Sequence, residues 1–121
     1  MKNRPFRERI GFAVAGIRAG WRREKSFRTH GLFAGLALLA LIILRPDPVW
    51  WGLVAVVIAL VMALELVNSA IEGIIDLLHP AVHPEIKVIK DMVAGAVLLI
   101  SVAALVVALA LVIASRHRLG I

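Results

Sequence analysis

Three carboxylates and one amide fall on the same side of a helix predicted in the middle of the chain. They are Glu65, Asn68, Glu72 and Asp76, with Ser69 beside them. At about 100° per residue, the four lie within roughly 80° of one another on a helical wheel. The residues around them are apolar or small, as in a membrane span. Ionisable groups in such a helix are costly and usually face a partner or a cavity, so the pattern indicates a functional site.

A second group of charged residues opens the next predicted helix. Lys87, Lys90 and Asp91 lie within about 100° of one another by the same periodicity. Acidic side chains can hold Mg²⁺, lysines can bind phosphate, and a carboxylate at the lipid boundary can take a proton from a hydroxyl group. The sequence has no Walker loop or other glycine-rich phosphate cradle. Any nucleotide site must therefore be built from these side chains.

Several of these residues also have a structural interpretation. Glu24 and Arg28 have the spacing of an exposed ion pair within one helix. Asp76 can pair with Lys87 or Lys90 across the turn that separates their helices. These alternatives stay open alongside a ligand role.

Asn68 also has a structural alternative, in which its side chain only forms a hydrogen bond between helices. His79 and His83 have side chains that can bind metal, but beside prolines they more simply line a loop. Glu65 is the hardest to explain structurally, because its sequence neighbours are apolar and no cation lies within a turn of it. A structural ion pair with a distant residue is the alternative to a catalytic role.

Composition identifies an integral membrane protein. Of the 121 residues, 61% are hydrophobic, in long apolar runs, and none is Cys. A disulfide scaffold and a thiolate metal site are therefore excluded. The net charge is +6, and nine of the fourteen Lys and Arg residues lie within residues 1 to 28. Beside a membrane span, such a segment indicates a cytoplasmic flank facing anionic lipid rather than a nucleic-acid site.

Four helical segments are predicted within a single membrane domain, residues 1–121. Residues 1–30 are expected to form an amphipathic helix on the membrane surface, because their apolar residues share one stripe and their basic residues lie elsewhere. Spans are expected at 27–44, 49–78 and 84–115, with proline-rich turns between them. The fold class is thus all-α, with three transmembrane helices. The stripe consists of Phe6, Ile10, Val14, Ile17 and Trp21.

The excess of positive charge in residues 1–28 predicts an N-terminus in the cytoplasm and a C-terminus outside. The acidic residues then lie at the cytoplasmic face, since the apolar residues before Glu65 rise roughly 24 Å across a core of about 30 Å. Two functions fit. One is an enzyme that modifies lipid at the interface. The other is a small transporter that couples Glu65 to ions, although a transporter site is expected nearer the midplane.

The sequence resembles the prokaryotic diacylglycerol kinase family, which includes the undecaprenol kinases. The central motif is Glu65-x2-Asn68-Ser-Ala-Ile-Glu72-x3-Asp76, followed by Lys90-Asp91-Met92. The N-terminal motif is Trp21-x2-Glu24-x2-Phe27-Arg28. The resemblance covers nearly the whole chain.

This resemblance implies a homotrimer in the bacterial cytoplasmic membrane that uses MgATP to phosphorylate a lipid hydroxyl in sites shared between subunits. Glu65 would be the general base. Glu24 and Glu72 would hold Mg²⁺. The residues implied to bind ATP are Glu24, Asn68, Glu72, Asp76, Lys90 and Asp91. Those implied to contact the lipid are Glu65, Arg28, Trp21 and Ser69.

The resemblance leaves two candidate substrates. The broad assignment of the family predicts phosphorylation of diacylglycerol to phosphatidic acid. His30 after Phe27-Arg28-Thr29, and His83-Pro84 before the last span, look more like the undecaprenol-type branch. Undecaprenol kinase is therefore the alternative.

Overall fold

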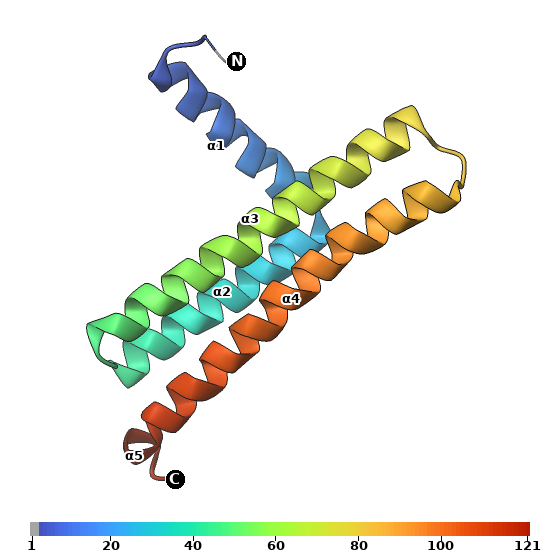
Figure 1. Cartoon of the computed structure of the whole chain (residues 1–121). Coiled ribbons are helices and arrows are strands. Elements are labelled where there is room, and N and C mark those ends of the chain that lie inside the picture. Colours follow the sequence, from blue (N-terminus) through green and yellow to red (C-terminus); the bar gives the residue numbers. More distant parts are fainter. Residues whose placement is uncertain (1–2) are drawn as a thin grey trace.

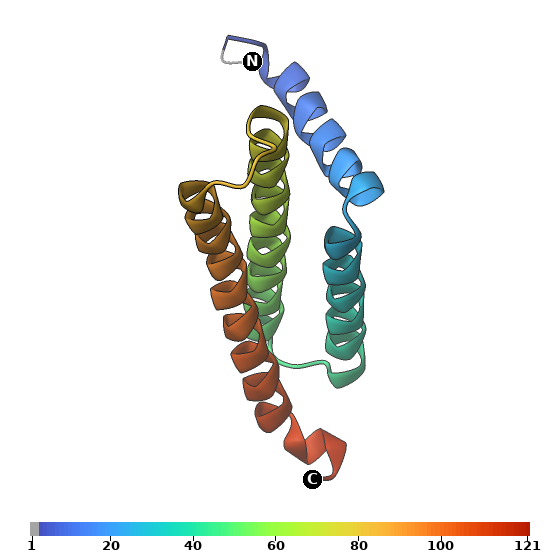
Figure 2. The same ribbon diagram turned by 90° about the vertical axis from the view of Figure 1, so that its right-hand side faces the viewer.

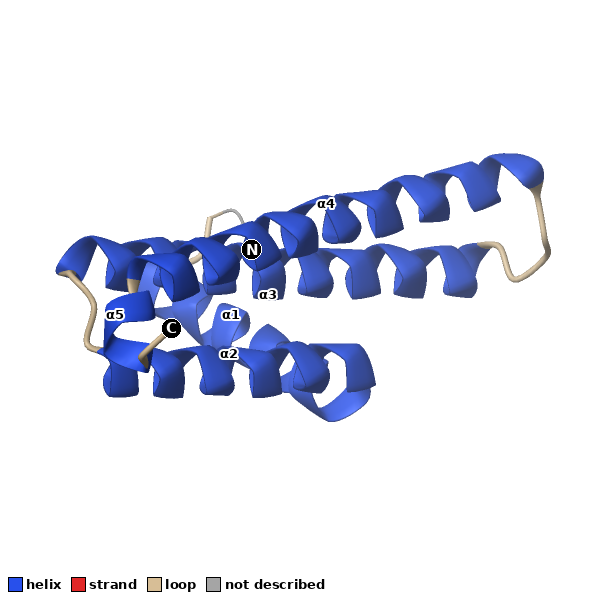
Figure 3. Ribbon diagram, turned by 90° about the horizontal axis from the view of Figure 1, so that it is seen from below, coloured by secondary structure: helices blue, strands red, loops and turns tan. Residues whose placement is uncertain are grey.

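Three long apolar helices make up the body of the molecule (Figure 1). The computed structural model describes residues 3–121, in which α2 spans Lys25–Leu44, α3 Pro48–Leu78 and α4 Pro84–Ala114. Each is long and apolar enough to cross a membrane. The predicted all-α membrane architecture with three apolar helices is therefore confirmed. Within residues 3–121 every regular element is a helix, as the colouring of Figure 3 shows.

α3 packs against both α2 and α4 (Figure 2). A cluster of Leu41, Leu44, Val54 and Leu111 joins the three helices. It lies near one end of the bundle, called here the Arg118 end, where residues 45–47 connect α2 to α3. The opposite end, where residues 79–83 connect α3 to α4, is called the Asp76 end.

Most large apolar side chains face outward. Leu99 is 75% exposed, Ile43 69% and Leu105 65%. A soluble monomer rarely exposes apolar surface over whole helices, because water disfavours it. In a bilayer the same surface is covered by lipid, so this exposure agrees with three membrane spans.

Proline and backbone conformation set the helix ends. α2 ends where Arg45 adopts the left-handed conformation, with φ of 45°. Pro48 then occupies the first turn of α3, where its missing N–H costs nothing. At the Asp76 end, the Nδ1 atom of His83 accepts a hydrogen bond of 3.1 Å from the N–H of Glu85, and Pro84 begins α4. His83 therefore caps a helix.

The N-terminal helix α1, Phe6–Arg23, projects away from the bundle (Figure 1). A single helix over residues 1–30 was expected, and this expectation is wrong, because Glu24 has extended backbone angles (φ −110°, ψ 110°) and separates α1 from α2. Residues 1 and 2 of that range lie outside the described residues. The Nη1 atom of Arg28 donates to the carbonyl oxygens of Trp21 at 2.7 Å and Arg22 at 3.1 Å. These bonds satisfy carbonyls that the end of α1 leaves free, and so stabilise the corner.

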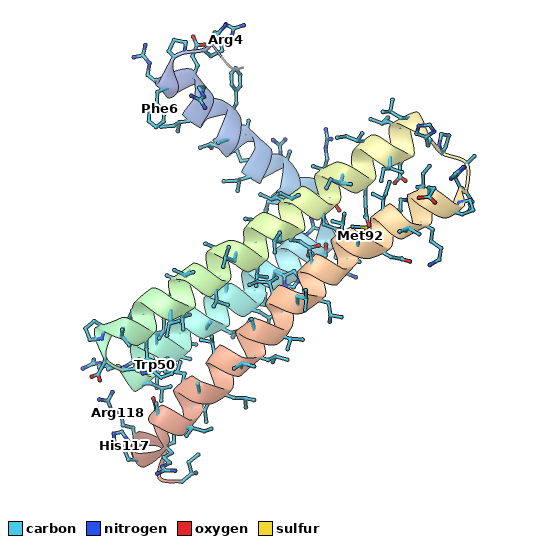
Figure 4. The ribbon with its side chains drawn as sticks, viewed as in Figure 1. Arg4, Phe6, Trp50, Met92, His117 and Arg118 are labelled. Atoms are coloured by element: carbon cyan, nitrogen blue, oxygen red, sulfur yellow. The ribbon has the colours of Figure 1, made fainter. Side chains whose placement is uncertain are left out.

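A short helix, α5, Arg116–Leu119, follows α4. It carries Arg118 back to the first connection, where the guanidinium donates to the carbonyl oxygens of Leu44 and Arg45. Figure 4 places Arg118 and Trp50 at this same end of the bundle, well away from Met92 on α4. No sequence pattern predicted this contact. The first described residues and the C-terminus lie at opposite ends of the molecule (Figure 2).

Candidate functional site

Glu65 lies in the middle of the candidate site, and only 4% of its surface is exposed. Two side chains of α2 engage its carboxylate. Ser26 donates from Oγ to Oε1 at 2.5 Å, and the Nε2 atom of His30 lies 3.4 Å from Oε2. The partners are thus a hydroxyl and an imidazole on another helix.

Sequence reasoning did not assign a role in the site to either partner of Glu65. Ser26 and His30 are four residues apart, so both face the same side of α2. That spacing was a usable signal, but nothing in the sequence aligned it with Glu65, 35 residues beyond His30. The register between two helices decides this contact.

Asn68 lies one turn after Glu65 on α3. Its Oδ1 atom is buried and has no hydrogen-bond partner among the residues that the structure describes. Buried acceptors of this kind are nearly always satisfied, so an isolated one points to a group that the single chain does not supply. A bound ligand or a neighbouring subunit can supply it.

Asp76 and Lys90 join α3 to α4 at the Asp76 end. Lys90 donates from Nζ to Oδ1 of Asp76 at 2.8 Å. Lys87 pairs with Asp91 within α4 at 2.6 Å, and both of these side chains are more than half exposed. The ion-pair interpretation of Asp76 is therefore correct for the single chain. The ATP-binding roles of Asp76, Lys90 and Asp91 stay predictions.

Two close approaches pack the α1–α2 corner, one against α3 and one between α2 and α1. A Cβ atom on Gly20 would lie 2.3 Å from Cδ2 of Leu66, and one on Gly31 would lie 2.5 Å from Cζ3 of Trp21. Trp21 also meets Phe27 edge to face, with ring centroids 6.3 Å apart. Glu24 sits at this corner, partly buried, so glycine and aromatic packing position the backbone that carries it.

The other predicted site residues occupy the same end. Glu72 and Ser69 are partly buried on α3, and Arg28 holds the corner rather than pairing with Glu24 through its guanidinium. Among residues 3–121, no group of three or more His, Asp or Glu side chains is arranged to hold a metal ion. Mg²⁺ bound mainly through nucleotide phosphates takes only one or two protein carboxylates. The pairing of Glu24 with Glu72 as ligands stays a prediction.

An apolar cavity of about 470 Å³ lies between α2, α3 and α4. Alanines on α2 and α4 leave this space open, and the only polar side chains lining it are His30 and Ser101. Since His30 also lies 3.4 Å from the carboxylate of Glu65, one wall of the cavity is the neighbour of the buried carboxylate. The alanines are Ala34, Ala37, Ala40, Ala104 and Ala108.

This arrangement brings three kinds of functional group to one end of a membrane bundle. A buried carboxylate can accept a proton, an unpaired amide oxygen can accept a ligand, and exposed charged groups can meet a soluble phosphate compound. An apolar space approaches the carboxylate from the membrane side. Such a site can join a lipid hydroxyl to a water-soluble reagent.

Comparison with known proteins supports this interpretation. The family model for prokaryotic diacylglycerol kinase matches residues 11–112. A diacylglycerol kinase of Escherichia coli K12 is 33% identical over 96 residues, which cover 79% of each chain. An undecaprenol kinase of Bacillus subtilis is 32% identical over 107 residues, covering 88% of this chain and 86% of that protein.

A diacylglycerol kinase of Synechocystis is 37% identical over 98 residues, which cover 79% of this chain. The match spans only 55% of the length of that protein. The family match and these relatives favour a kinase over the ion-coupled transporter considered as an alternative. This chain is a bacterial membrane protein that belongs to the prokaryotic diacylglycerol kinase family.

Proposed function

We propose that the protein transfers the γ-phosphoryl group of ATP to the hydroxyl group of a membrane lipid alcohol, with diacylglycerol as the leading substrate and phosphatidic acid as the product. The observation that carries this proposal is the burial of Glu65 beside an apolar cavity in a member of this family. A carboxylate in that position meets a hydroxyl group at headgroup depth. Membrane lipid alcohols present such a group.

The reaction needs a base and a means of stabilising charge. Glu65 takes the proton of the lipid hydroxyl, and the lipid oxygen forms a bond to the γ-phosphorus. The bond from that phosphorus to the bridging oxygen breaks, and ADP leaves with the electron pair. General-base assistance of this kind contributes about 10²–10⁴-fold to a rate.

The residues around Glu65 fit the magnesium ion that accompanies ATP. The unpaired Oδ1 of Asn68 and the carboxylate of Glu72 lie on the same side of α3, and Glu24 comes from the corner of α1 and α2. Oxygen donors of this kind suit Mg²⁺, which keeps part of its shell for phosphate and water. Glu24 and Glu72 would hold the ion, which neutralises phosphate charge when bound. Asn68 would accept a hydrogen bond or a water molecule beside it.

Charged groups at the Asp76 end would receive the nucleotide. Lys90 already reaches across from α4 to α3, and its ammonium group would contact phosphate as well as Asp76. Asp91 would position the same region. Trp21, Arg28 and Ser69 would face the lipid side, at the corner where α1 meets the bundle.

The assembly we propose is a homotrimer with sites shared between subunits. The unpaired acceptor of Asn68 and the open face of the bundle support a contribution from another chain. We also propose that the Asp76 end faces the cytoplasm, with α1 on the membrane surface and the C-terminus outside. The basic residues of α1 and the exposed apolar side chains Phe6, Ile17 and Trp21 support this placement.

Undecaprenol is the second candidate substrate. The undecaprenol kinase of Bacillus subtilis matches this chain over nearly its whole length, at an identity close to that of the diacylglycerol kinase of Escherichia coli. His30, one of the two residues that look like the undecaprenol-type branch, is also the residue that contacts Glu65.

The test is a side-by-side assay of the purified protein with MgATP and each lipid. Formation of phosphatidic acid at the higher kcat/KM would support diacylglycerol as the substrate. A higher kcat/KM for undecaprenol would make undecaprenol the substrate in place of diacylglycerol. The Glu65→Gln variant serves as the control for contaminating kinases, and absence of lipid phosphorylation from both substrates would overturn the proposal.

A further inference from the structure

Two side chains of one neighbouring helix approach the carboxylate of Glu65, one at each oxygen. Ser26 bonds to Oε1 at 2.5 Å, and His30 lies 3.4 Å from Oε2. The side chain of Glu65 is 5% exposed and that of His30 is 25% exposed. Because Ser26 and His30 are one helical turn apart on α2, they face Glu65 from the same side.

A clamp of this kind controls orientation. An ionised carboxylate offers about four lone-pair sites on its two oxygens. Ser26 occupies one site on Oε1, and the Nε2 atom of His30 lies 3.4 Å from Oε2, so the two side chains restrict the rotation of the group and leave the remaining sites free. Without them the side chain would retain two or three rotatable bonds, and the base would meet the lipid hydroxyl in many geometries. Misplacement by about 1 Å can cost about 10²-fold in rate.

The location of His30 adds a second reason to expect more than packing. Its imidazole both contacts Glu65 and lines the apolar cavity, so it lies where a lipid would approach the carboxylate. Ser26, by contrast, lies toward the corner where α1 meets α2 and does not line the cavity.

We infer that His30 and Ser26 are positioning residues that hold the carboxylate of Glu65 in the orientation required to take the proton of the lipid hydroxyl. This inference rests on the proposed function, in which Glu65 is the general base. Neither residue takes the proton itself. Both act through Glu65, so their effects on the rate depend on its carboxylate.

The experiment compares paired variants of the full-length protein in detergent or lipid. His30→Leu removes the nitrogen at similar size, and His30→Gln restores a side-chain N–H with similar reach. Ser26→Ala removes the hydroxyl, and Ser26→Thr restores it. Thr29→Val is the matched control, because Thr29 lies on the same helix and its hydroxyl donates to the carbonyl oxygen of Lys25 within its own helix.

We expect His30→Leu to lower kcat by about 10²-fold, with KM for ATP unchanged. His30→Gln should recover most of this loss, and Ser26→Thr should recover the smaller loss of Ser26→Ala. Thr29→Val should behave as the parent. A purely structural role predicts instead that the melting temperature falls while the kcat of the folded enzyme stays unchanged.

A double variant separates this inference from the proposed function. If His30 acts through Glu65, adding His30→Leu to Glu65→Gln should cause no further loss of the residual rate. Full activity of Glu65→Gln would remove the proposed base, whatever His30 does. An inactive Glu65→Gln with a fully active His30→Leu would overturn the positioning role alone. Failure of both His30 variants to fold would also overturn it, in favour of a structural pair.

Discussion

The ammonium group of Lys90 and the carboxylate of Asp76 lie 2.8 Å apart, so that one ion pair joins α4 to α3 at the Asp76 end. Both side chains are more than a third exposed, so the pair adds little to stability. Its value is geometric, because it holds the one lysine predicted to contact phosphate against the helix that carries Glu65.

Lys90→Ala should lower kcat/KM for ATP by about 10²-fold, since a cation beside the transferred phosphoryl group stabilises its developing charge. Binding of the lipid substrate should persist. Steady-state kinetics at varied ATP and fixed lipid measure this effect. Lys87→Ala is the comparison variant, because it also removes a cation from the start of α4 but leaves the pair between Lys90 and Asp76 in place. Equal kinetics in the two variants would leave Lys90 with a structural role only.

Glu65→Gln should reduce turnover by at least about 10²-fold, because the amide keeps the shape of the side chain but cannot take a proton. The variant should still bind ATP and keep the oligomeric state of the parent. Turnover, nucleotide binding and sedimentation provide the three measurements. Turnover close to the parent value would exclude Glu65 as the base.

Glu72→Gln should abolish turnover at ordinary Mg²⁺ concentrations, since one of the two predicted carboxylate ligands is lost. Turnover should partly recover as the Mg²⁺ concentration is raised. Titration of activity with Mg²⁺ measures the shift. Glu85→Gln is a suitable control, because Glu85 lies in the first turn of α4 and is not a predicted ligand. An unchanged Mg²⁺ dependence in Glu72→Gln would contradict the ligand assignment.

Gly31→Ala should destabilise the α1–α2 corner by about 1–3 kcal/mol, because its Cβ would lie 2.5 Å from the indole ring of Trp21. Thermal unfolding in detergent, followed by tryptophan fluorescence, measures the change. Gly35→Ala on the same helix meets no atom within 4 Å and should be neutral or stabilising. Equal melting temperatures for both variants would show that the corner tolerates the added methyl group.

A reporter fused after Ile121 should be active only in the form that works outside the cytoplasm, since nine of the fourteen Lys and Arg residues lie within residues 1–28. A reporter fused at the N-terminus is the complementary control. A cytoplasmic signal from the C-terminal fusion would contradict the three-span orientation and move the acidic residues to the other face.

The helix ends show how much of this fold could be predicted from sequence. Pro48 and Pro84 mark the beginnings of α3 and α4, because proline is tolerated in a first turn and disfavoured further in. The break at Glu24 has no such signal. It depends on contacts made by Arg28 and by the glycines at the corner, which require the tertiary structure.

Part of the candidate site could likewise be predicted from the sequence, and part depends on the tertiary structure. The stripe that holds Glu65, Asn68 and Glu72 follows from helical periodicity alone. The contacts of Ser26 and His30 with Glu65 depend on how α2 and α3 are aligned, and no local pattern contains that information.

The contact of Arg118 with the carbonyl oxygens of Leu44 and Arg45 has a mechanical consequence. Together with the apolar cluster around Leu41 and Leu111, it fastens all three spans at one end. The other end is linked by an exposed ion pair and a short loop. Relative motion of the spans is therefore expected to be larger beside Glu72 and Asp76 than at Arg118.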